Sequence, residues 1–264
     1  MNYQIAIIGG GNLGTAIAEG LVKSKFAKPE NITITKRNTT TLKDWKVKGV
    51  NIISDNSMAV KNSQIVILAV KPYQVAAVIE GFKKHLTKKH LLISVITGVS
   101  ITDLGEMVQK ELPVFRAMPN TAIAIRESIT CISHAKATEE QVAYVTNLFS
   151  NLGKVAMIDE KLMDAATVLG ACGTAYAMRY IRANIQGGIE IGFDAKTASL
   201  IAAQTVKGAA ELLLKNGSHP EQEIDKVTTP KGCTIVGLNE MEHQGFSSSL
   251  IRGVITSYNK ILKD

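Results

Sequence analysis

Residues 226–245 place a proline and a glycine directly before an amphipathic helical pattern. Pro230 presets its backbone φ, and Gly232 lets a ligand approach the backbone without meeting a Cβ. The unpaired N–H groups of Gly232, Cys233 and Thr234 would then point at an anion, and a small carboxylate fits such a site. An ordinary helix start after a surface turn explains the same residues, because proline is common in the first turn of helices. Both interpretations remain open on this segment alone.

A second chemical pattern lies near residue 1, where a β-branched run leads into Gly9-x-Gly11-x-x-Gly14 and then a helical stretch. Gly9 permits a tight turn, Gly11 lets the backbone meet a pyrophosphate, and Gly14 lets the helix pack closely on the strand. The position after a strand and before a helix predicts dinucleotide binding, with the phosphates at the helix N-terminus.

The second predicted strand ends at Lys36-Arg37-Asn38, where an NAD-binding protein would place an acidic residue on the ribose 2′-hydroxyl. A carboxylate is missing there, and a guanidinium beside an ammonium favours a 2′-phosphate. The inferred cofactor is therefore NADP(H), with NAD(H) as second choice. A solvated basic turn is the alternative interpretation.

Composition is typical of a globular enzyme with two domains. The 264 residues are 45% hydrophobic and 20% charged, and the longest apolar runs have strand length, too short for a membrane span. Without a cationic leader, and without a CxxC pair among Cys131, Cys172 and Cys233, we expect a cytoplasmic protein that lacks disulfides.

The histidines form no HxxxH or HxxE pair, so we expect no metal. The lysines behind the +7 net charge are spread along the chain, so we expect neither nucleic acid nor membrane as a partner.

Strand and helix alternate along the first part of the chain. Strands are predicted over 3–8, 31–35, 50–53, 64–70, 91–96, 113–117, 128–133 and 154–158. This alternation predicts a doubly wound, mainly parallel sheet, here an NADP-binding Rossmann domain of residues 1–158. Thr138-Glu-Glu-Gln141 forms a capping box for a helix that we expect to end at Gly153.

The pattern of residues 159–264 is helical throughout. Helices are predicted over 160–192, 195–215, 219–227, 234–244 and 247–263. The second of them carries small residues nearly all round, which lets other backbones approach closely. It is therefore buried between subunits or in the core of a monomeric bundle.

Four motifs of this chain resemble those of pyrroline-5-carboxylate reductases. They are Leu68-Ala-Val-Lys-Pro72, Arg116-Ala-Met-Pro-Asn-Thr121, Ala203-Gln-Thr-Val-Lys-Gly-Ala-Ala210 and the run 227–245. The resemblance covers essentially the whole chain. It implies reduction of 1-pyrroline-5-carboxylate to L-proline, the last step of proline biosynthesis, by hydride transfer from NAD(P)H to the cyclic imine carbon. It also implies a homodimer or higher homo-oligomer, in which the dimerisation and substrate-binding domain of residues 159–264 interleaves with that of a partner to build the active site.

The resemblance also assigns binding residues. Cofactor contacts fall on Gly9, Gly11, Asn12, Leu13, Gly14, Lys36, Arg37, Asn38, Asn56, Ala69, Val70, Lys71, Pro72 and Asn120. Substrate contacts fall on Val227, Thr229, Gly232, Cys233 and Thr234. The roles of two residues stay open. Lys71 either contacts the cofactor or has no role of its own, with Pro72 alone shaping the turn. Tyr176 either lines the substrate pocket or belongs to the hydrophobic core.

Two segments depart from the family's usual pattern. Gly170-Ala-Cys-Gly-Thr-Ala-Tyr176 replaces Ser-Gly-Ser-Gly-Pro-Ala-Tyr, and Pro230-Lys-Gly-Cys-Thr234 replaces Pro-Gly-Gly-(Thr/Ala)-Thr. Lys231 either attracts the substrate carboxylate or faces solvent. Cys233 contributes its backbone N–H and is no nucleophile, because a hydride transfer needs none.

Such a reaction needs few reactive side chains. A protonated cyclic imine is already a good electrophile and the cofactor supplies the hydride, so the protein mainly holds two molecules face to face. Thr234 is the candidate catalytic residue. Its hydroxyl passes a proton to the ring nitrogen, orients the ring, or only satisfies the helix backbone.

Two other functions fit parts of the sequence. A β-hydroxyacid dehydrogenase also joins a Rossmann domain to helices, but it needs a catalytic lysine on the long helix, and no lysine occurs between Lys161 and Lys196. A non-catalytic NADP-binding or sensing protein would keep the fold. The intact substrate loop counts against that alternative.

Overall fold

The computed structural model of the chain describes residues 3–263. It contains two compact units, of which the first extends through Cys172 and includes the residues from Lys260 on, and the second covers Gly173–Asn259. The sequence pattern changes earlier, at residues 158 and 159, and that domain boundary stays a prediction. The strands of the described residues all belong to the first unit.

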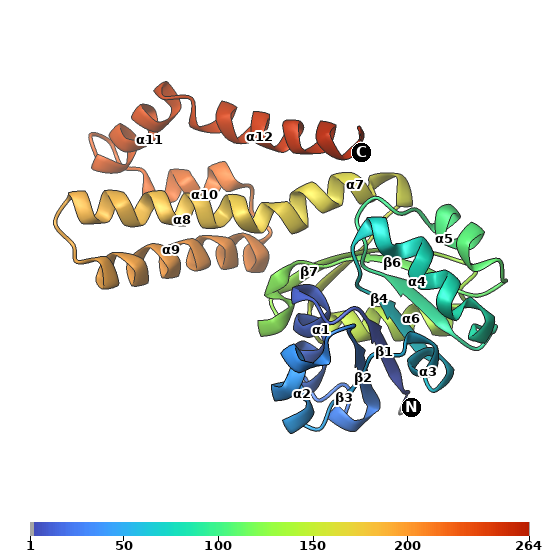
Figure 1. Cartoon of the computed structure of the whole chain (residues 1–264). Coiled ribbons are helices and arrows are strands. Elements are labelled where there is room, and N and C mark those ends of the chain that lie inside the picture. The colour runs from blue at the N-terminus through green and yellow to red at the C-terminus, as the bar shows by residue number, and fades with distance from the viewer. Residues whose placement is uncertain (1–2, 264) are drawn as a thin grey trace. The chain divides into compact units, whose positions relative to one another are not determined.

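A single eight-stranded sheet forms the centre of the first unit (Figure 1). The strands are β1 (Ile5–Ile8), β2 (Ile32–Thr35), β3 (Asn51–Ile53), β4 (Ile65–Leu68), β5 (Leu91–Ser94), β6 (Val114–Met118), β7 (Ser128–Ala135) and β8 (Gly153–Met157). Their order in space is β3-β2-β1-β4-β5-β6-β7-β8, and only β6 and β7 pair antiparallel. The predicted doubly wound, mainly parallel sheet is therefore confirmed.

Helices cover both faces of this sheet. They are α1 (Asn12–Lys23), α2 (Lys43–Val47), α3 (Asn56–Lys61), α4 (Val75–Phe82), α5 (Ile101–Val108), α6 (Glu139–Ser150) and α7 (Met163–Ala166). Ile5 and Ile7 of β1 belong to the hydrophobic cluster that includes α1 and α6, whereas Ala6 and Ile8 belong to the cluster that includes α3, α4 and α5. Because both faces are buried, the central strands are continuous apolar runs instead of alternating patterns.

The end of α6 differs from the prediction. The capping box of Thr138 and Gln141 is present, but the helix ends at Ser150, and Gly153 begins β8. Gly153 has a φ of +146°, and a Cβ there would collide with the backbone of Ser128 in the neighbouring strand. The glycine therefore permits a close strand approach and does not cap the helix.

The predicted single helix over 160–192 was wrong. A 3₁₀ turn at Glu160–Leu162 and the short α7 lead into a π-helical segment, Thr167–Cys172, before α8 (Gly173–Glu190) begins. The hydroxyl of Thr167 donates to the carbonyl of Met163 at 2.9 Å, a type of bond that often bends helices. The helical periodicity is present, but it does not reveal this local widening.

The second unit is entirely helical within the described residues. It contains α8, α9 (Ala195–Asn216), α10 (Pro220–Val227), α11 (Cys233–His243) and most of α12 (Phe246–Ile261). Helices α8 and α9 lie side by side (Figure 1). Helix α12 contacts α8 through a 2.6 Å hydrogen bond between the hydroxyls of Ser257 and Tyr176.

Few apolar side chains of this unit are covered by their own chain. Ala198 and Ala202 of α9 are the buried residues of its five helices, all of which lie in the described range. Large apolar residues stay exposed on all five helices, among them Met178, Leu200, Leu214, Val227, Val236, Ile251 and Ile255. Such a surface is typical of helices that pack against another chain.

Of the helices in the described part of the chain, none is both long enough and apolar enough to cross a bilayer.

Candidate functional site

The predicted cofactor residues follow strands that are neighbours in the sheet. Gly9 to Gly14 follow β1, Lys36 to Asn38 follow β2, Asn56 follows β3, and Ala69 to Pro72 follow β4. Because β3, β2, β1 and β4 are adjacent and parallel, these loops meet at one edge of the sheet. The strand order reverses between β1 and β4, which is where doubly wound sheets bind their ligands.

The glycines after β1 are required by close backbone contacts. Gly9 has a φ of +117°, and a Cβ there would lie 2.5 Å from the carbonyl oxygen of Ala69. A Cβ on Gly14 would collide with the carbonyl oxygen of Gly9. In contrast, a Cβ on Gly11 would meet no atom of the described protein within 4 Å, so the backbone at Gly11 has open space beside it. This arrangement fits a pyrophosphate approaching the start of α1.

Glycine is the N-cap residue of two helices, so no side chain at the N-cap position can accept a hydrogen bond from the first turn. They are α1, with N-cap Gly11, and α11, with N-cap Gly232. Side chains cap α3, α5, α6, α9 and α10 instead. The helix N-termini without such a cap therefore include the two at which the sequence predicted an anion.

The basic residues after β2 lie beside the glycine loop. The backbone N–H of Gly10 donates to the carbonyl of Thr35 at 2.8 Å, which ties the two loops together. Lys36 is half-buried and Arg37 is exposed. The Oδ1 of Asn38 accepts from the backbone N–H of Thr40, so this side chain also shapes the loop. Next to this loop is a hollow of about 220 Å³, lined by Thr39, Thr40, Leu42, Lys43, Lys46 and Ile52.

Three other predicted cofactor residues have different local settings. Asn56 is the half-buried first residue of α3. Lys71 is exposed and precedes Pro72 at the start of a 3₁₀ turn. Asn120 is engaged at both side-chain atoms: Oδ1 accepts from the backbone N–H of Ala122 at 3.0 Å, and Nδ2 donates to the carbonyl of Gly170 at 3.1 Å. Asn120 therefore anchors the π-helical segment, whatever it does for the cofactor.

The predicted substrate loop forms a tight turn before α11. The backbone N–H of Gly232 donates to the carbonyl of Thr229 at 2.9 Å, so it is not available to a ligand. In this respect the sequence interpretation was wrong, because it counted Gly232 among the free donors. Cys233 and Thr234, the first two residues of α11, keep N–H groups that have no partner within an α-helix.

The side chains of this loop are largely accessible. Thr229, Lys231 and Cys233 are exposed, Thr234 is half-buried, and Val227 at the end of α10 is 64% exposed. Tyr176 is half-buried and bonded to Ser257, so it does not belong to a buried core of this unit.

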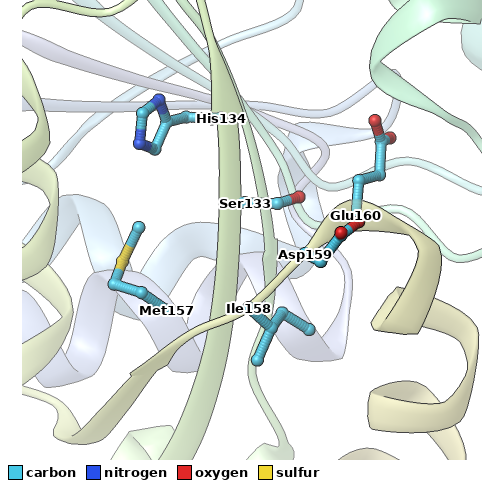
Figure 2. Close-up of a pocket in the computed structure, with 6 residues that line it drawn as sticks. All are labelled: Ser133, His134, Met157, Ile158, Asp159 and Glu160. Carbon is cyan, nitrogen blue, oxygen red and sulfur yellow. The ribbon is translucent and has the colours of Figure 1, made fainter.

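Apart from these loops, the first unit has a hollow of about 470 Å³ lined by Ser133, His134, Met157, Ile158, Asp159 and Glu160. Figure 2 shows Ser133 and Glu160 on one side of the strand and His134 with Met157 on the other. None of the predicted site residues lines it. Among residues 3–263, no group of three or more His, Cys, Asp or Glu side chains is arranged to hold a metal ion.

The structure brings together two charged residues, Arg116 and Glu160, for which the sequence predicts no role. Arg116 of β6 is 6% exposed, and its Nη1 lies 3.2 Å from Oε1 of Glu160. The partners are 44 residues apart in the sequence, so no local pattern reveals the pair.

Comparisons with known proteins cover both units. A family model described as pyrroline-5-carboxylate reductase dimerisation matches residues 160–263. A second model, described as NADP oxidoreductase coenzyme F420-dependent, matches residues 4–98.

Curated relatives match nearly the whole chain. Pyrroline-5-carboxylate reductase 1 of Dictyostelium discoideum is 47% identical over 97% of this chain, which spans about half (49%) of that relative's length. Pyrroline-5-carboxylate reductase 2 of the same organism is 43% identical, over 99% of this chain and 93% of its own length.

Solved structures of the same family have a similar fold over nearly the whole chain. The crystal structure of Plasmodium falciparum pyrroline carboxylate reductase with NADP bound has a TM-score of 0.91 and 29% identity, and the match covers 98% of this chain and 97% of that chain. A 3-hydroxyisobutyrate dehydrogenase of Mycobacterium tuberculosis has a TM-score of 0.54 and 14% identity, covers 83% of this chain and 72% of that chain, and shares only the fold.

Proposed function

The chain belongs to the pyrroline-5-carboxylate reductase family, and from this premise we propose that it reduces 1-pyrroline-5-carboxylate to L-proline with NADPH. The observation that carries the proposal is that helices α1 and α11 each have a glycine at the N-cap position and no side-chain cap. One suits a pyrophosphate and the other a carboxylate, the anions of the two reactants.

The first unit fits the nucleotide. Gly11 leaves room at the start of α1, and Lys36 and Arg37 follow the strand whose end faces the ribose in such folds. Because the two side chains are cationic, we assign NADP(H) as the preferred cofactor and NAD(H) as second choice. The remaining proposed cofactor contacts are Asn12, Leu13, Asn38, Asn56, Asn120 and the Ala69 to Pro72 loop.

The second unit fits the substrate. We assign the carboxylate to the N–H groups of Cys233 and Thr234, which the helix leaves unpaired. Thr229 and Val227 flank this turn, and Gly232 forms it.

The bound cofactor supplies the hydride for the imine carbon. The protein's own task is to orient the ring and to handle one proton at its nitrogen. The Thr234 hydroxyl, half-buried one residue inside α11, is the group assigned to that nitrogen.

The assembly is a homodimer or higher homo-oligomer. The second unit leaves large apolar side chains exposed on all five of its helices, and its sequence matches a dimerisation family. A partner that covers them would remove apolar surface from water, which stabilises the assembly by about 25 cal/mol per Å² buried.

We assign residues 1–158 to nucleotide binding and 159–264 to dimerisation and substrate binding. The three free cysteines fit the reducing environment of the cytoplasm.

A β-hydroxyacid dehydrogenase is the nearest competing function. Its fold is similar, but the stretch between Lys161 and Lys196, which includes α8, lacks the catalytic lysine that class requires. This sequence difference favours imine reduction.

The direct test mixes the purified protein with NADPH and 1-pyrroline-5-carboxylate and follows the loss of NADPH absorbance. We expect turnover that requires both reactants and formation of proline, and slower turnover with NADH at equal concentration. Reactions without the imine, or with a β-hydroxyacid and NADP⁺, serve as controls. A protein that binds NADPH but turns over neither substrate would instead be a nucleotide-binding or sensing protein.

A further inference from the structure

Glu160 joins three parts of the first unit through one carboxylate oxygen. Its Oε1 accepts the backbone N–H of Ile101 at 2.6 Å and lies 3.2 Å from Nη1 of Arg116. The other terminal nitrogen of Arg116 lies 3.4 Å from Oδ1 of Asp164 in α7. The residues after β8 are thereby bonded both to β6 and to the start of α5.

Side chains of the protein itself make hydrogen bonds at the N-terminus of α5. Ser100 and Asp103 form a capping box, and Ile101, the first helical residue, donates to Glu160. Hydrogen bonds from Ser100 hold the pKa of Asp103 below its usual range, and Arg116 contributes a smaller electrostatic effect in the same direction. Glu160 accepts the N–H of Ile101, the Ser100 hydroxyl accepts that of Asp103, and two carboxylates lie at the positive end of this helix.

The loop that Glu160 holds in place lies in the second half of the nucleotide-binding sheet. Residues 95–100 connect the carboxyl end of β5 to α5, and the backbone N–H of Val95 donates to the carbonyl of Leu68 at 3.0 Å. This loop is therefore tied to the end of β4, directly before the Ala69 to Pro72 loop. In a doubly wound sheet the first half takes the adenosine end of a dinucleotide, so the half formed by β4, β5 and β6 takes the nicotinamide end.

We infer that Glu160 is a positioning residue, which holds the 95–100 loop in the conformation that orients the nicotinamide ring of the cofactor. The inference rests on the proposed nucleotide site. A charge-assisted hydrogen bond to a backbone N–H fixes the loop more firmly than a neutral one. Arg116, almost fully buried in β6, fixes the carboxylate in turn. The adenosine end is held separately, at the loops after β1 and β2, so loss of Glu160 changes the ring's orientation more than the nucleotide's affinity.

The test compares Glu160→Ala, Glu160→Gln and the control Asp159→Ala. Gln keeps an acceptor for Ile101 and loses only the charge, whereas Ala removes both. Asp159 is the neighbouring carboxylate, but it is exposed and bonds to Lys161 at the start of the same 3₁₀ turn, so it tests the turn separately from the bonds of Glu160 to Arg116 and Ile101. For each protein, kcat with saturating reactants, the Kd for NADPH, the fluorescence of bound NADPH and the thermal midpoint are measured.

We expect Glu160→Ala to lower kcat on the order of 10- to 100-fold, because small displacements of reacting groups have effects of this size. The Kd for NADPH should rise less than about threefold, a change below 1 kcal/mol. The nicotinamide fluorescence of the complex should shift toward that of free NADPH. Glu160→Gln should recover most of the kcat, and Asp159→Ala should match the unsubstituted protein.

Three outcomes would overturn the inference. They are a kcat within about twofold of the unsubstituted protein for Glu160→Ala, an equal loss in Asp159→Ala, and a loss of NADPH affinity as large as the loss of kcat. The last would mean that Glu160 only stabilises the fold. An unsubstituted protein that binds NADPH without reducing the imine would contradict the proposed function instead, and the fluorescence comparison would still decide the role of Glu160.

Discussion

Gly232 donates its backbone N–H to the carbonyl of Thr229, and this bond closes a turn in which Lys231 takes a φ of +62°. The second middle position of such a turn favours glycine, because side chains are strained there. Gly232 itself has an ordinary φ of −73°, but a Cβ there would lie 2.5 Å from Oγ1 of Thr229. The turn therefore uses Lys231 where its backbone favours glycine, and it uses glycine where a neighbouring side chain leaves no room.

Replacing Lys231 by glycine should relieve this strain and keep the enzyme active. We expect the KM for the imine to rise no more than about fivefold, because an exposed charge pair contributes at most about 1 kcal/mol. Lys231→Asn tolerates the same backbone conformation without the charge, and Lys231→Arg keeps the charge. A large KM increase in the Gly and Asn variants that Arg does not share would show that the lysine charge binds the carboxylate.

Thr234→Ala should separate the roles of its hydroxyl. The carboxylate can still dock on the N–H groups of the first turn, so KM should change little. A general acid at this position predicts a kcat loss of roughly 10²-fold or more, and a group that only orients the ring predicts a modest loss. Steady-state kinetics across pH distinguish the two, with Thr234→Ser as the control. Unchanged kcat and KM would mean that the hydroxyl belongs only to the helix start.

Arg37→Asp should change the cofactor preference. Loss of a charge-assisted contact of about 1.5–3 kcal/mol should raise the KM for NADPH roughly 10- to 150-fold and leave that for NADH similar or lower. Lys89→Asp, an exposed lysine elsewhere in the first unit, makes the same charge change and serves as the control. Equal losses with both cofactors in Arg37→Asp would argue against a 2′-phosphate site.

A charge on the apolar surface of α12 should weaken the oligomer. Ile251 and Ile255 are 58% and 52% exposed on neighbouring positions of the helix, and burying a glutamate between subunits carries a large desolvation penalty. We expect Ile251→Glu with Ile255→Glu to shift the mass measured by light scattering toward the monomer and to reduce activity. Val47→Glu, at an 88% exposed valine of the first unit, should change neither. An active monomer of the unsubstituted protein would exclude the proposed assembly.

The sheet was predictable because its strands are short β-branched runs between clear helical patterns, and all eight predicted strands are present. The loops after β1, β2 and β4 were predictable as one group, since parallel strands bring their carboxyl ends to the same edge. The π-helical segment was not, because its hydrogen bond to Asn120 comes from 50 residues away. The contact between Glu160 and Ile101 spans 59 residues, and the bond that uses Gly232's N–H depends on turn geometry. Contacts of these kinds leave no periodic signal in the sequence.

Because its own chain buries so little of the second unit, the proposed oligomer should make the folding of this protein depend on its concentration. Ala198 and Ala202 are the buried residues of α8 to α12 in the single chain, so we expect these helices to gain most of their stability from the proposed association. Unfolding then releases separate chains, so the melting temperature should rise as the protein is concentrated and fall on dilution. A newly synthesised chain would therefore have a helical unit that is not yet stably packed, until it associates with a second copy of the chain. The rate at which α8 to α12 reach their folded state should therefore increase with the concentration of this protein in the cell.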